Sequence, residues 1–295
     1  MKVDNAIIMA AGTSSRFAPL SYERHKALTV VKGEVLIERQ IRQLRDAGIQ
    51  DVYVVTGYKA EQFDYLAEKY GVTLIHNPEY LTRNNNGSIW AVRHILGNSY
   101  ICSADNYFGI NPFEGEVDGA YYAAVYADGH TPEWCMEEDA AGYISSVTIG
   151  GENAWYMLGH AFWSRDFSSR FLSILEEEYE REETRDKLWE KIFMAHLDVL
   201  KMRIRKYGPG AIYEFDTLDE LREFDPSYIT DTRSTLIQRV AAELGVGEEQ
   251  IVCLAPLKSD TTAATGFSFR CGEDRYQYLY DRGTLEKMHC GTALC

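Results

Sequence analysis

The amino-acid sequence predicts an α/β protein whose sheet is mostly parallel and is covered by helices on both faces. Three observations predict this class. Short apolar runs bounded by turn residues alternate with amphipathic stretches through residues 6–77, in the order β-α-β-α-β. In the amphipathic stretches the apolar residues recur at the spacing of one helix face. Finally, 45% of the 295 residues are hydrophobic, which is enough to fill the core of a large domain.

Each element of this alternation can be placed along the chain. AIIMA at residues 6–10 predicts the first strand, and VLIERQIRQLRDAGI at 35–49 predicts a helix. DVYVVTG at 51–57, AEQFDYLAEKYG at 60–71 and VTLIHN at 72–77 predict a strand, a helix and a strand. Ligands of such sheets bind beyond the carboxyl ends of the strands, where the loop after residue 10 lies. The apolar face of the first helix consists of Leu36, Ile37, Ile41 and Leu44.

The middle of the chain carries further strands and long helical patterns. SYICSADNYF at residues 99–108 predicts a strand followed by a loop, and GAYYAAVYA at 119–127 predicts another strand. Residues 165–200 predict helices, and the acidic run EEEYEREE within them is typical of a solvated helix face. Residues 208–224 predict a glycine-rich turn, a strand, and a helix beginning near Thr217 with the T-x-x-E spacing of a capping box.

The pattern changes after Asp225-Pro226. STLIQRVAAELG predicts a helix, and IVCLAPL, FSFRCG and RYQYLYD predict short strands. We therefore predict two domains, a large α/β domain at residues 1–229 and a small α+β appendage at residues 230–295.

Composition narrows the kind of partner and the compartment. The formal net charge of -15 opposes broad contact with a phosphate backbone, so we expect no nucleic-acid partner. We also expect a cytoplasmic protein with no membrane insertion, because the N-terminal residues lack a secretion signal and no apolar run is long enough to span a bilayer. The cysteines contain no C-x-x-C pair, which disfavours a zinc or redox motif and a disulfide framework. They are Cys102, Cys135, Cys253, Cys271, Cys290 and Cys295.

The loop after the first strand, IIMAAGTSSRF, suits an anionic ligand. Such a turn exposes backbone N–H groups, Gly12 permits a sharp turn or a close backbone approach, and the serines add donors. The loop is neither a Walker loop nor a dinucleotide fingerprint, so an ordinary tight turn is the alternative to phosphate binding. Arg16 and Lys26 favour phosphate binding, because arginine forks two phosphate oxygens and lysine supplies a compact charge.

These residues resemble a known signature. MAAGTSSRF followed by HKAL resembles A-A-G-x-G-[ST]-R followed by P-K, found in the nucleotidyltransferases that activate sugar phosphates and phosphocholine. SADNY, NNNGSIW, PEW and IYEFD are similar to the bacterial CTP:phosphocholine cytidylyltransferases, over about residues 1–224. The resemblance implies the three-layer Rossmann-like nucleotidyltransferase fold. This chain departs from the pattern at Ser14, His25 and Ser103, which stand where glycine, proline and a further acidic residue are usual.

The resemblance also implies a set of site residues. It assigns catalysis to Arg16 and Lys26, and it assigns the cofactor Mg²⁺ to Asp105 and Asp216, each of which follows an apolar strand. Carboxylates that neutralise a triphosphate through Mg²⁺ suit this chemistry, although a lone aspartate often only caps a helix or makes a turn. The nucleotide-binding residues implied are Ala10, Ala11, Gly12, Thr13, Ser14, Asn85, Ser88 and Ala104.

Recognition of the phosphorylated alcohol is expected after the metal-binding strand. A quaternary ammonium donates no hydrogen bond, so aromatic faces and a carboxylate are its usual partners. Most aromatic side chains instead belong to the core or to dimer contacts, so we expect two or three of these candidates to contact phosphocholine. The candidates are Tyr126, Glu133, Trp134, Trp155, Tyr156 and Trp189.

The appendage weakly resembles the first helix and strands of choline-kinase-like phosphotransferases, but the printed sequence has no kinase catalytic loop after it. We therefore expect a noncatalytic segment that packs on the first domain or makes a homodimer contact. The expected reaction joins CTP and phosphocholine to give CDP-choline and pyrophosphate. The alternatives are the same chemistry on a sugar 1-phosphate, phosphoethanolamine or 2-aminoethylphosphonate, or a nucleotide-binding regulatory protein without catalysis.

Overall fold

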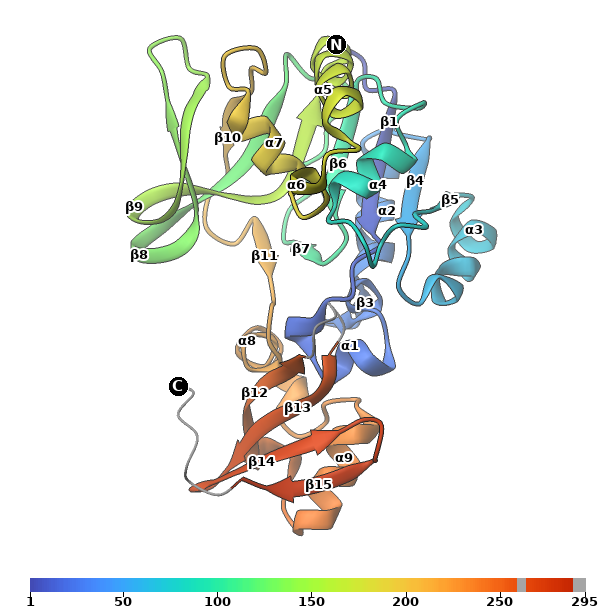
Figure 1. Ribbon diagram of the computed structural model, residues 1–295, viewed down its shortest axis with the longest axis vertical. Helices are drawn as coiled ribbons and strands as arrows, with labels where there is room; N and C mark the ends of the chain where they lie inside the picture. Colours follow the sequence, from blue (N-terminus) through green and yellow to red (C-terminus); the bar gives the residue numbers. More distant parts are fainter. Residues whose placement is uncertain (259–263, 289–295) are drawn as a thin grey trace. The chain divides into compact units, whose positions relative to one another are not determined.

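The structure is a computed structural model that describes residues 1–258 and 264–288 (Figure 1). It divides into two compact units, which we describe separately. The first unit comprises residues 1–12 and 34–214, and the second comprises residues 13–33 and those from 215 onward. These units do not coincide with the predicted domains 1–229 and 230–295, because the loop after the first strand packs with the C-terminal segment. The division into domains at residues 1–229 and 230–295 stays a prediction.

The first unit is built around a seven-stranded sheet in the order β10-β8-β9-β6-β1-β4-β5. Within this described sheet β9 alone runs against its neighbours, so the predicted α/β class with a mostly parallel sheet is confirmed. β7 and β11 form a separate antiparallel pair. The strands are β1 Asn5–Ala10, β3 Glu34–Val35, β4 Val52–Thr56, β5 Thr73–His76, β6 Ser99–Ser103, β7 Asn106–Phe108, β8 Tyr121–Glu138, β9 Ile144–Trp163, β10 Arg203–Lys206 and β11 Ile212–Glu214.

The helices of the first unit follow the predicted alternation. The apolar face predicted for the first helix is buried in α2, since all four of its apolar residues are almost inaccessible to solvent. The helical patterns predicted at 165–200 form three helices. The helices are α2 Leu36–Asp46, the short 3-10 helix η3 Ala60–Phe63, α3 Asp64–Tyr70, α4 Asn86–Ala91, α5 Arg165–Glu178, α6 Glu182–Arg185 and α7 Trp189–Ala195.

The sequence did not predict the long hairpin of β8 and β9. The predicted strand at 119–127 is only the first half of β8, and no strand was expected at 144–163. Glycine and asparagine at 150–153 interrupt the apolar pattern of β9, and the β8–β9 ladder contains several register shifts. Pairing over such a length is decided by tertiary contacts rather than by local periodicity.

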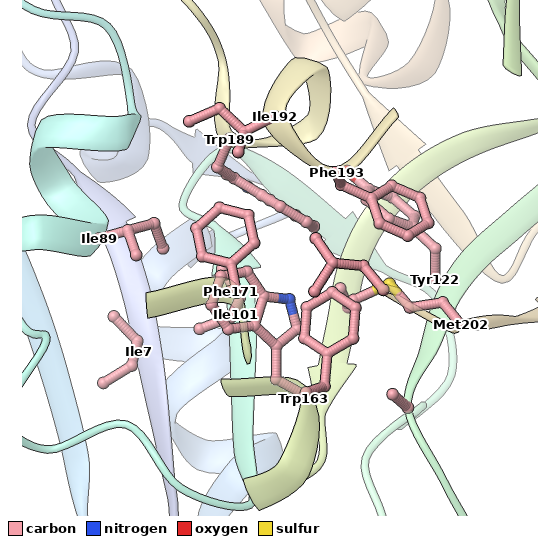
Figure 2. Close-up of a cluster of buried hydrophobic side chains, with 14 of the residues drawn as sticks. Ile7, Ile89, Ile101, Tyr122, Trp163, Phe171, Trp189, Ile192, Phe193 and Met202 are labelled. Atoms are coloured by element: carbon pink, nitrogen blue, oxygen red, sulfur yellow. The ribbon is translucent and has the colours of Figure 1, made fainter. Parts of the chain in front are cut away.

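An aromatic cluster fills the core on one face of this sheet (Figure 2). Trp163 of β9 lies 4.5 Å from Phe171 of α5 and 5.0 Å from Trp189 of α7, measured between ring centroids. Ile89 of α4 and Ile101 of β6 belong to the same cluster. Burial of these large side chains holds α4, α5 and α7 on the sheet.

The second unit contains a four-stranded antiparallel sheet in the order β12-β13-β14-β15, together with helix α9. The predicted helix and three strands are present here, and β15 was not predicted. The apolar side of α9 is buried through Ile237 and Val240. The elements are η1 Ser15–Phe17, α1 Leu20–Glu23, η2 Lys26–Leu28, β2 Val30–Val31, α8 Leu218–Phe224, η4 Pro226–Tyr228, α9 Thr235–Leu244, η5 Glu248–Gln250, β12 Ile251–Lys258, β13 Ala264–Cys271, β14 Asp274–Leu279 and β15 Thr284–Lys287.

Two further expectations concern the whole chain. None of the helices described here has both the length and the apolar character needed to cross a bilayer. The four cysteines within the described residues are free thiols: Cys102, Cys135, Cys253 and Cys271. Cys290 and Cys295 lie outside the described residues.

Candidate active site

In the first unit, the candidate site begins where β1 ends. Ala10 and Ala11 are buried, and the carbonyl of Ala11 accepts a hydrogen bond from the backbone N–H of Tyr58 at 3.1 Å. A Cβ at Gly57 would lie 2.8 Å from that same carbonyl oxygen and 2.6 Å from the Cβ of Tyr80. Gly57 is therefore required where the loop after β4 approaches the end of β1, a role that the sequence did not predict.

Gly12 differs from Gly57 because the fold itself does not require glycine there. A Cβ at Gly12 would meet no atom within 4 Å, and its φ does not lie in the left-handed region. The space that a side chain would fill at Gly12 is thus empty, which leaves room for a close-fitting ligand, as the resemblance implies. Thr13, the next residue, is the first residue of the second unit.

Ser14 adopts the left-handed conformation, with φ 48° and ψ 42°. A residue with a Cβ is disfavoured here by about 1–2 kcal/mol, whereas glycine is not. This explains physically why the related signature usually has glycine at this position. The carbonyl of Ser14 accepts from the N–H of Phe17 at 3.0 Å and so begins η1, which carries Arg16.

In the second unit, Arg16, Lys26 and Asp216 form what we call the cation–carboxylate cluster. The Nη1 of Arg16 and the Nζ of Lys26 both donate to the carboxylate of Asp216, Lys26 at 3.3 Å. The side chain of Lys26 is only 4% exposed, that of Asp216 is 25% exposed and that of Arg16 is 67% exposed. Three residues that the sequence assigned to one chemistry therefore lie together, with one cation held rigidly and the other reaching solvent.

Local structure fixes the backbone on both sides of this cluster. Thr217 caps α8: its Oγ1 accepts from the N–H of Glu220 at 3.2 Å, which confirms the predicted capping box. The Glu220 carboxylate in turn accepts from the N–H of Asp216 at 2.6 Å. On the other segment, the Nδ1 of His25 accepts from the N–H of Ala27 at 3.1 Å. His25 thus begins η2 as a cap, although proline is usual there in the related signature.

Asp105 belongs to the first unit and lies in the turn between β6 and β7. The preceding residues are anchored, because Ala104 is buried and the carbonyl of Ser103 accepts from the Nε2 of Gln40 at 3.1 Å. Asp105 therefore comes directly after the anchored end of β6, as the sequence predicted. Its role stays a prediction.

The asparagine turn before α4 has a clear structural role. The Oδ1 of Asn85 accepts from the N–H of Trp189 at 2.6 Å, and its Nδ2 donates to Glu190 at 3.0 Å. Ser88 is buried and its Oγ accepts from Asn77 at 3.3 Å. The amide of Asn85 therefore connects α4 to α7, which makes it a support of the turn that is expected to hold the nucleotide.

The predicted aromatic residues fall into two groups. Trp189 is 1% exposed and stacks on Tyr122 with ring centroids 5.6 Å apart, so it belongs to the core and its faces do not reach a ligand (Figure 2). Its burial therefore gives no support to the expected role of Trp189 in substrate binding, which stays a prediction. Trp134, Trp155 and Tyr156 on β8 and β9 are half-buried. Tyr126 is exposed and packs edge-on against Trp155 at 5.3 Å.

Carboxylates lie near Tyr156, one of these aromatics, and near the buried Tyr122, and we call Tyr122, Glu133, Tyr156, Glu190 and Glu214 the acidic–aromatic cluster. Burial raises the pKa of Tyr156, and the nearby carboxylates Glu133 and Glu214 raise it further. Burial also raises the pKa of Tyr122, with the carboxylates of Glu190 and Glu214 adding to the effect. The Tyr122 hydroxyl donates to Glu190 at 3.2 Å. Rings within the field of several carboxylates suit a cationic ligand.

Glu190 and Glu214 were not predicted as site residues. Burial raises the pKa of Glu190, although hydrogen bonds from Asn85 and Tyr122 oppose that effect. Glu214 accepts from the Nδ2 of Asn106 at 3.4 Å. The available signals were slight: Glu190 adjoins Trp189 in the sequence, and Glu214 precedes the predicted ligand Asp216 by two positions.

The carboxylates also fit a divalent cation held mainly by its substrate. The residues that the structure describes contain no group of three His, Cys, Asp or Glu side chains able to hold a metal. Mg²⁺, however, is commonly bound by one or two carboxylates while phosphate and water supply its other ligands. Asp105 and Asp216 are hard oxygen donors of the kind that Mg²⁺ prefers, and their joint binding of the ion stays a prediction.

Sequence comparison identifies a family and several relatives of this chain. Residues 6–108 match the MobA-like NTP transferase domain family. The chain is 32% identical to choline-phosphate cytidylyltransferase of Streptococcus pneumoniae over 75% of this chain and 96% of that protein. It is 34% identical to 2-aminoethylphosphonate cytidylyltransferase of Lancefieldella rimae over 78% of this chain and 95% of that protein.

Solved structures show the same fold. The structure of CTP:phosphocholine cytidylyltransferase from Streptococcus pneumoniae (LicC) superposes with a TM-score of 0.73 at 32% identity, covering 77% of this chain and 99% of that one. A glucose-1-phosphate thymidylyltransferase from Bacillus anthracis, at 16% identity and a TM-score of 0.61, shares the fold alone.

These relatives and the shared fold show that the chain is a nucleotidyltransferase. Within that class, the chain belongs to the bacterial cytidylyltransferase family that includes the choline-phosphate cytidylyltransferases. It is an enzyme of the transferase class.

Proposed function

We propose that this cytidylyltransferase joins CTP and phosphocholine to give CDP-choline and pyrophosphate. A phosphate oxygen of phosphocholine attacks the α-phosphorus of CTP, and the bond between that phosphorus and the bridging oxygen of pyrophosphate breaks. The observation that carries the proposal is the buried Lys26 held against Asp216 after the phosphate loop. The relatives named above supply the substrate pair.

The cations act by position and charge. Lys26 is nearly inaccessible to solvent and bound to a fixed partner, so its ammonium is suited to meet the α-phosphate and the incoming phosphate. Arg16 is largely exposed, so its guanidinium can fork the β- and γ-phosphates as the nucleotide enters. In this proposal both cations exchange part of their contact with Asp216 for contact with phosphate.

We propose Mg²⁺ as cofactor, with Asp105 and Asp216 as its protein ligands. When bound, the ion neutralises triphosphate charge during transfer. Asp216 suits this role because its side chain is 25% exposed and its backbone N–H is held by the carboxylate of Glu220. Asp105 is proposed from its place in the SADNY turn after β6.

The nucleotide is proposed to bind along the turn that follows β1 and the asparagine turn. The backbone of Ala10, Ala11, Gly12, Thr13 and Ser14 supplies donors for phosphate, with Gly12 leaving room for close approach. For the base we propose the α4 turn with Asn85 and Ser88, and Ala104 at the end of β6. In this assignment Asn85 positions the turn, since its amide already bonds Trp189 and Glu190.

Phosphocholine is proposed as the phosphorylated substrate that reacts with CTP, and the acidic–aromatic cluster is the reason. A quaternary ammonium is attracted by ring faces and carboxylates and needs no acceptor within hydrogen-bond distance. Tyr156 and Glu133 provide such groups, and Trp134, Trp155 and Tyr126 lie on the same hairpin.

A second candidate substrate is 2-aminoethylphosphonate. A relative of that specificity is 34% identical to this chain. Its primary ammonium donates three hydrogen bonds, which the carboxylates of the same cluster can accept. Tightly packed ring faces favour phosphocholine, whereas carboxylates within hydrogen-bond distance favour the amine.

The proposal is tested by pyrophosphate release. Four nucleoside triphosphates are combined with phosphocholine, phosphoethanolamine, 2-aminoethylphosphonate and glucose 1-phosphate. We expect the highest kcat/KM with CTP and phosphocholine. A preference for glucose 1-phosphate or for another nucleotide contradicts the proposal. CTP binding without release of pyrophosphate with any of the four phosphorylated substrates contradicts it too.

We further propose that the enzyme is cytoplasmic, where free thiols such as those described here are usual. We also propose a homodimer, which light scattering would test.

A further inference from the structure

Within the second unit, Glu23 binds the N-terminus of α9. Its carboxylate accepts hydrogen bonds from the hydroxyls of Ser234 and Thr235, and from the N–H of Leu236 at 3.2 Å. Ser234 is also the N-cap of α9, since its Oγ accepts from Ile237 at 3.2 Å. A carboxylate at this end of a helix also opposes the positive pole of the helix dipole. The bond joins residues 211 positions apart in the sequence.

Glu23 is the last residue of α1, and Lys26 follows three residues later. Glu23 therefore fixes the chain directly before the buried cation. Tyr22 adds to this anchor, because its ring stacks on Tyr280 with centroids 3.7 Å apart. The segment before Lys26 is thus attached both to helix α9 and to the turn that follows β14.

A second anchor follows Lys26. The carbonyl of Val30 accepts from the hydroxyl of Tyr228 at 2.7 Å and from Arg233 at 2.8 Å. The N–H of Lys32 donates to Asp225 at 2.7 Å. Lys26 consequently lies between two attachment points, at residues 22–23 and 30–32, and both attach to residues beyond 224.

The helix after Asp216 is attached to the same part of the chain. The carboxylate of Asp219 accepts from the N–H of Cys253 at 2.8 Å. The guanidinium of Arg222 donates to the carbonyls of Ile251 at 2.7 Å and Glu248 at 2.8 Å. The segments that carry Lys26 and Asp216 therefore share one support.

We propose that residues 225–258, which we call the brace, position the cation–carboxylate cluster, and that Glu23 is the positioning residue connecting the brace to Lys26. This inference rests on the proposed function of Lys26 in binding the triphosphate. It gives the C-terminal segment a task in catalysis without a catalytic group of its own. The Streptococcus pneumoniae relative is covered to 96% by 75% of this chain, so a quarter of this chain has almost no counterpart there.

The test compares Glu23→Ala and Glu23→Gln with the wild-type enzyme. We expect Glu23→Ala to lower kcat/KM for CTP by about tenfold while KM for phosphocholine changes by less than about twofold. Glu23→Gln, which keeps the shape and one acceptor, should recover part of the loss. Amide hydrogen exchange at residues 20–33 should quicken in Glu23→Ala, because the anchored segment opens more often.

The matched control is Asp274→Asn, which removes a carboxylate paired with Lys287 in the same unit. It should leave CTP kinetics and exchange at residues 20–33 unchanged. If Glu23→Ala does not fold, Thr235→Val removes one donor, leaves the Ser234 cap, and should change the same readouts in the same direction.

Two results would overturn the inference. In the first, folded Glu23→Ala keeps the wild-type kcat/KM for CTP and the wild-type hydrogen exchange at residues 20–33. In the second, Glu23→Ala and Asp274→Asn lose the same kcat/KM for CTP and for phosphocholine. If the wild-type enzyme itself releases no pyrophosphate, the proposed function fails instead. The positioning claim is then decided by hydrogen exchange together with CTP affinity measured by calorimetry.

Discussion

The Nζ of Lys26 lies 3.3 Å from the Oδ1 of Asp216, across 190 positions of sequence. A nearly inaccessible ammonium needs a partner, because removing a charge from water is costly unless it is paired. Asp216 is shared with the exposed Arg16, so one carboxylate holds two cations close to where phosphate is expected. The arrangement keeps both charges in place before a nucleotide arrives, which is the condition for electrostatic stabilisation without rearrangement.

Gly12→Ala should separate ligand binding from folding. Because a Cβ at Gly12 meets no atom within 4 Å, the free energy of unfolding should change by less than about 1 kcal/mol. CTP affinity should nevertheless fall about tenfold, since the new methyl group occupies space needed by phosphate. Gly119→Ala is the matched control, because that glycine is equally open, and it should keep CTP affinity. Wild-type affinity in Gly12→Ala would argue against the proposed phosphate loop.

Asn85→Ala should destabilise the enzyme even without nucleotide. The substitution leaves the N–H of Trp189 and the carboxylate of Glu190 each without one hydrogen-bond partner, at a cost of about 1–3 kcal/mol. Urea unfolding measures this loss. Asn84→Ala should cost less, because the side chain of Asn84 makes its hydrogen bonds with Asp186 and with the N–H of Asn85 at exposed positions. Equal losses in the two variants would show that the link from α4 to α7 is unimportant.

Trp189→Ala and Trp155→Ala should fail in different ways. Trp189 is buried among Trp163, Phe171 and Tyr122, so its truncation should cost about 3–5 kcal/mol of stability. Trp155 is half-buried, and its loss should cost about 1 kcal/mol while raising KM for phosphocholine about tenfold. Thermal unfolding and steady-state kinetics separate the two effects. An unchanged KM in Trp155→Ala would remove that residue from the proposed alcohol site.

His160 should make the enzyme less stable in acid. Burial, together with the nearby cation of Arg205, lowers the pKa of His160 to about 3. Between that value and its ordinary pKa of 6.5, the unfolded chain binds a proton that the folded protein does not. Stability from this residue is therefore present above pH 6.5 and falls by about 1.4 kcal/mol per pH unit below it.

Urea unfolding at several pH values between 4 and 7 measures this slope. His160→Leu should reduce the slope by about one proton, whereas His130→Gln, at an exposed histidine, should not. A slope that is the same in His160→Leu and in the wild-type enzyme would contradict the assignment.

The features that depend on residues close together in the sequence were predicted correctly. The apolar face of α2 and the capping box of Thr217 and Glu220 depend on residues within a few positions, and both are present in the structure. The strand β9 was missed because its glycines interrupt the period, and its pairing with β8 is a long-range contact. Burial of Trp189 could not be read from its sequence neighbours for the same reason.

The site shows the same division. Arg16, Lys26 and Asp216 were chosen through resemblance to a family, because no periodicity connects positions 190 to 200 residues apart. The support given by Asn85 to α7 and by Glu23 to α9 was not predicted, since each bond joins distant segments through polar side chains with many alternative partners.

The most direct measurement is the rate of pyrophosphate release by Lys26→Ala with CTP and phosphocholine. We expect kcat to fall at least about 100-fold in a folded protein, because the buried cation proposed to meet the α-phosphate is lost. Lys258→Ala, an exposed lysine of β12 in the same unit, should keep wild-type activity. Wild-type turnover in folded Lys26→Ala would contradict the central claim that the cation–carboxylate cluster carries the transfer.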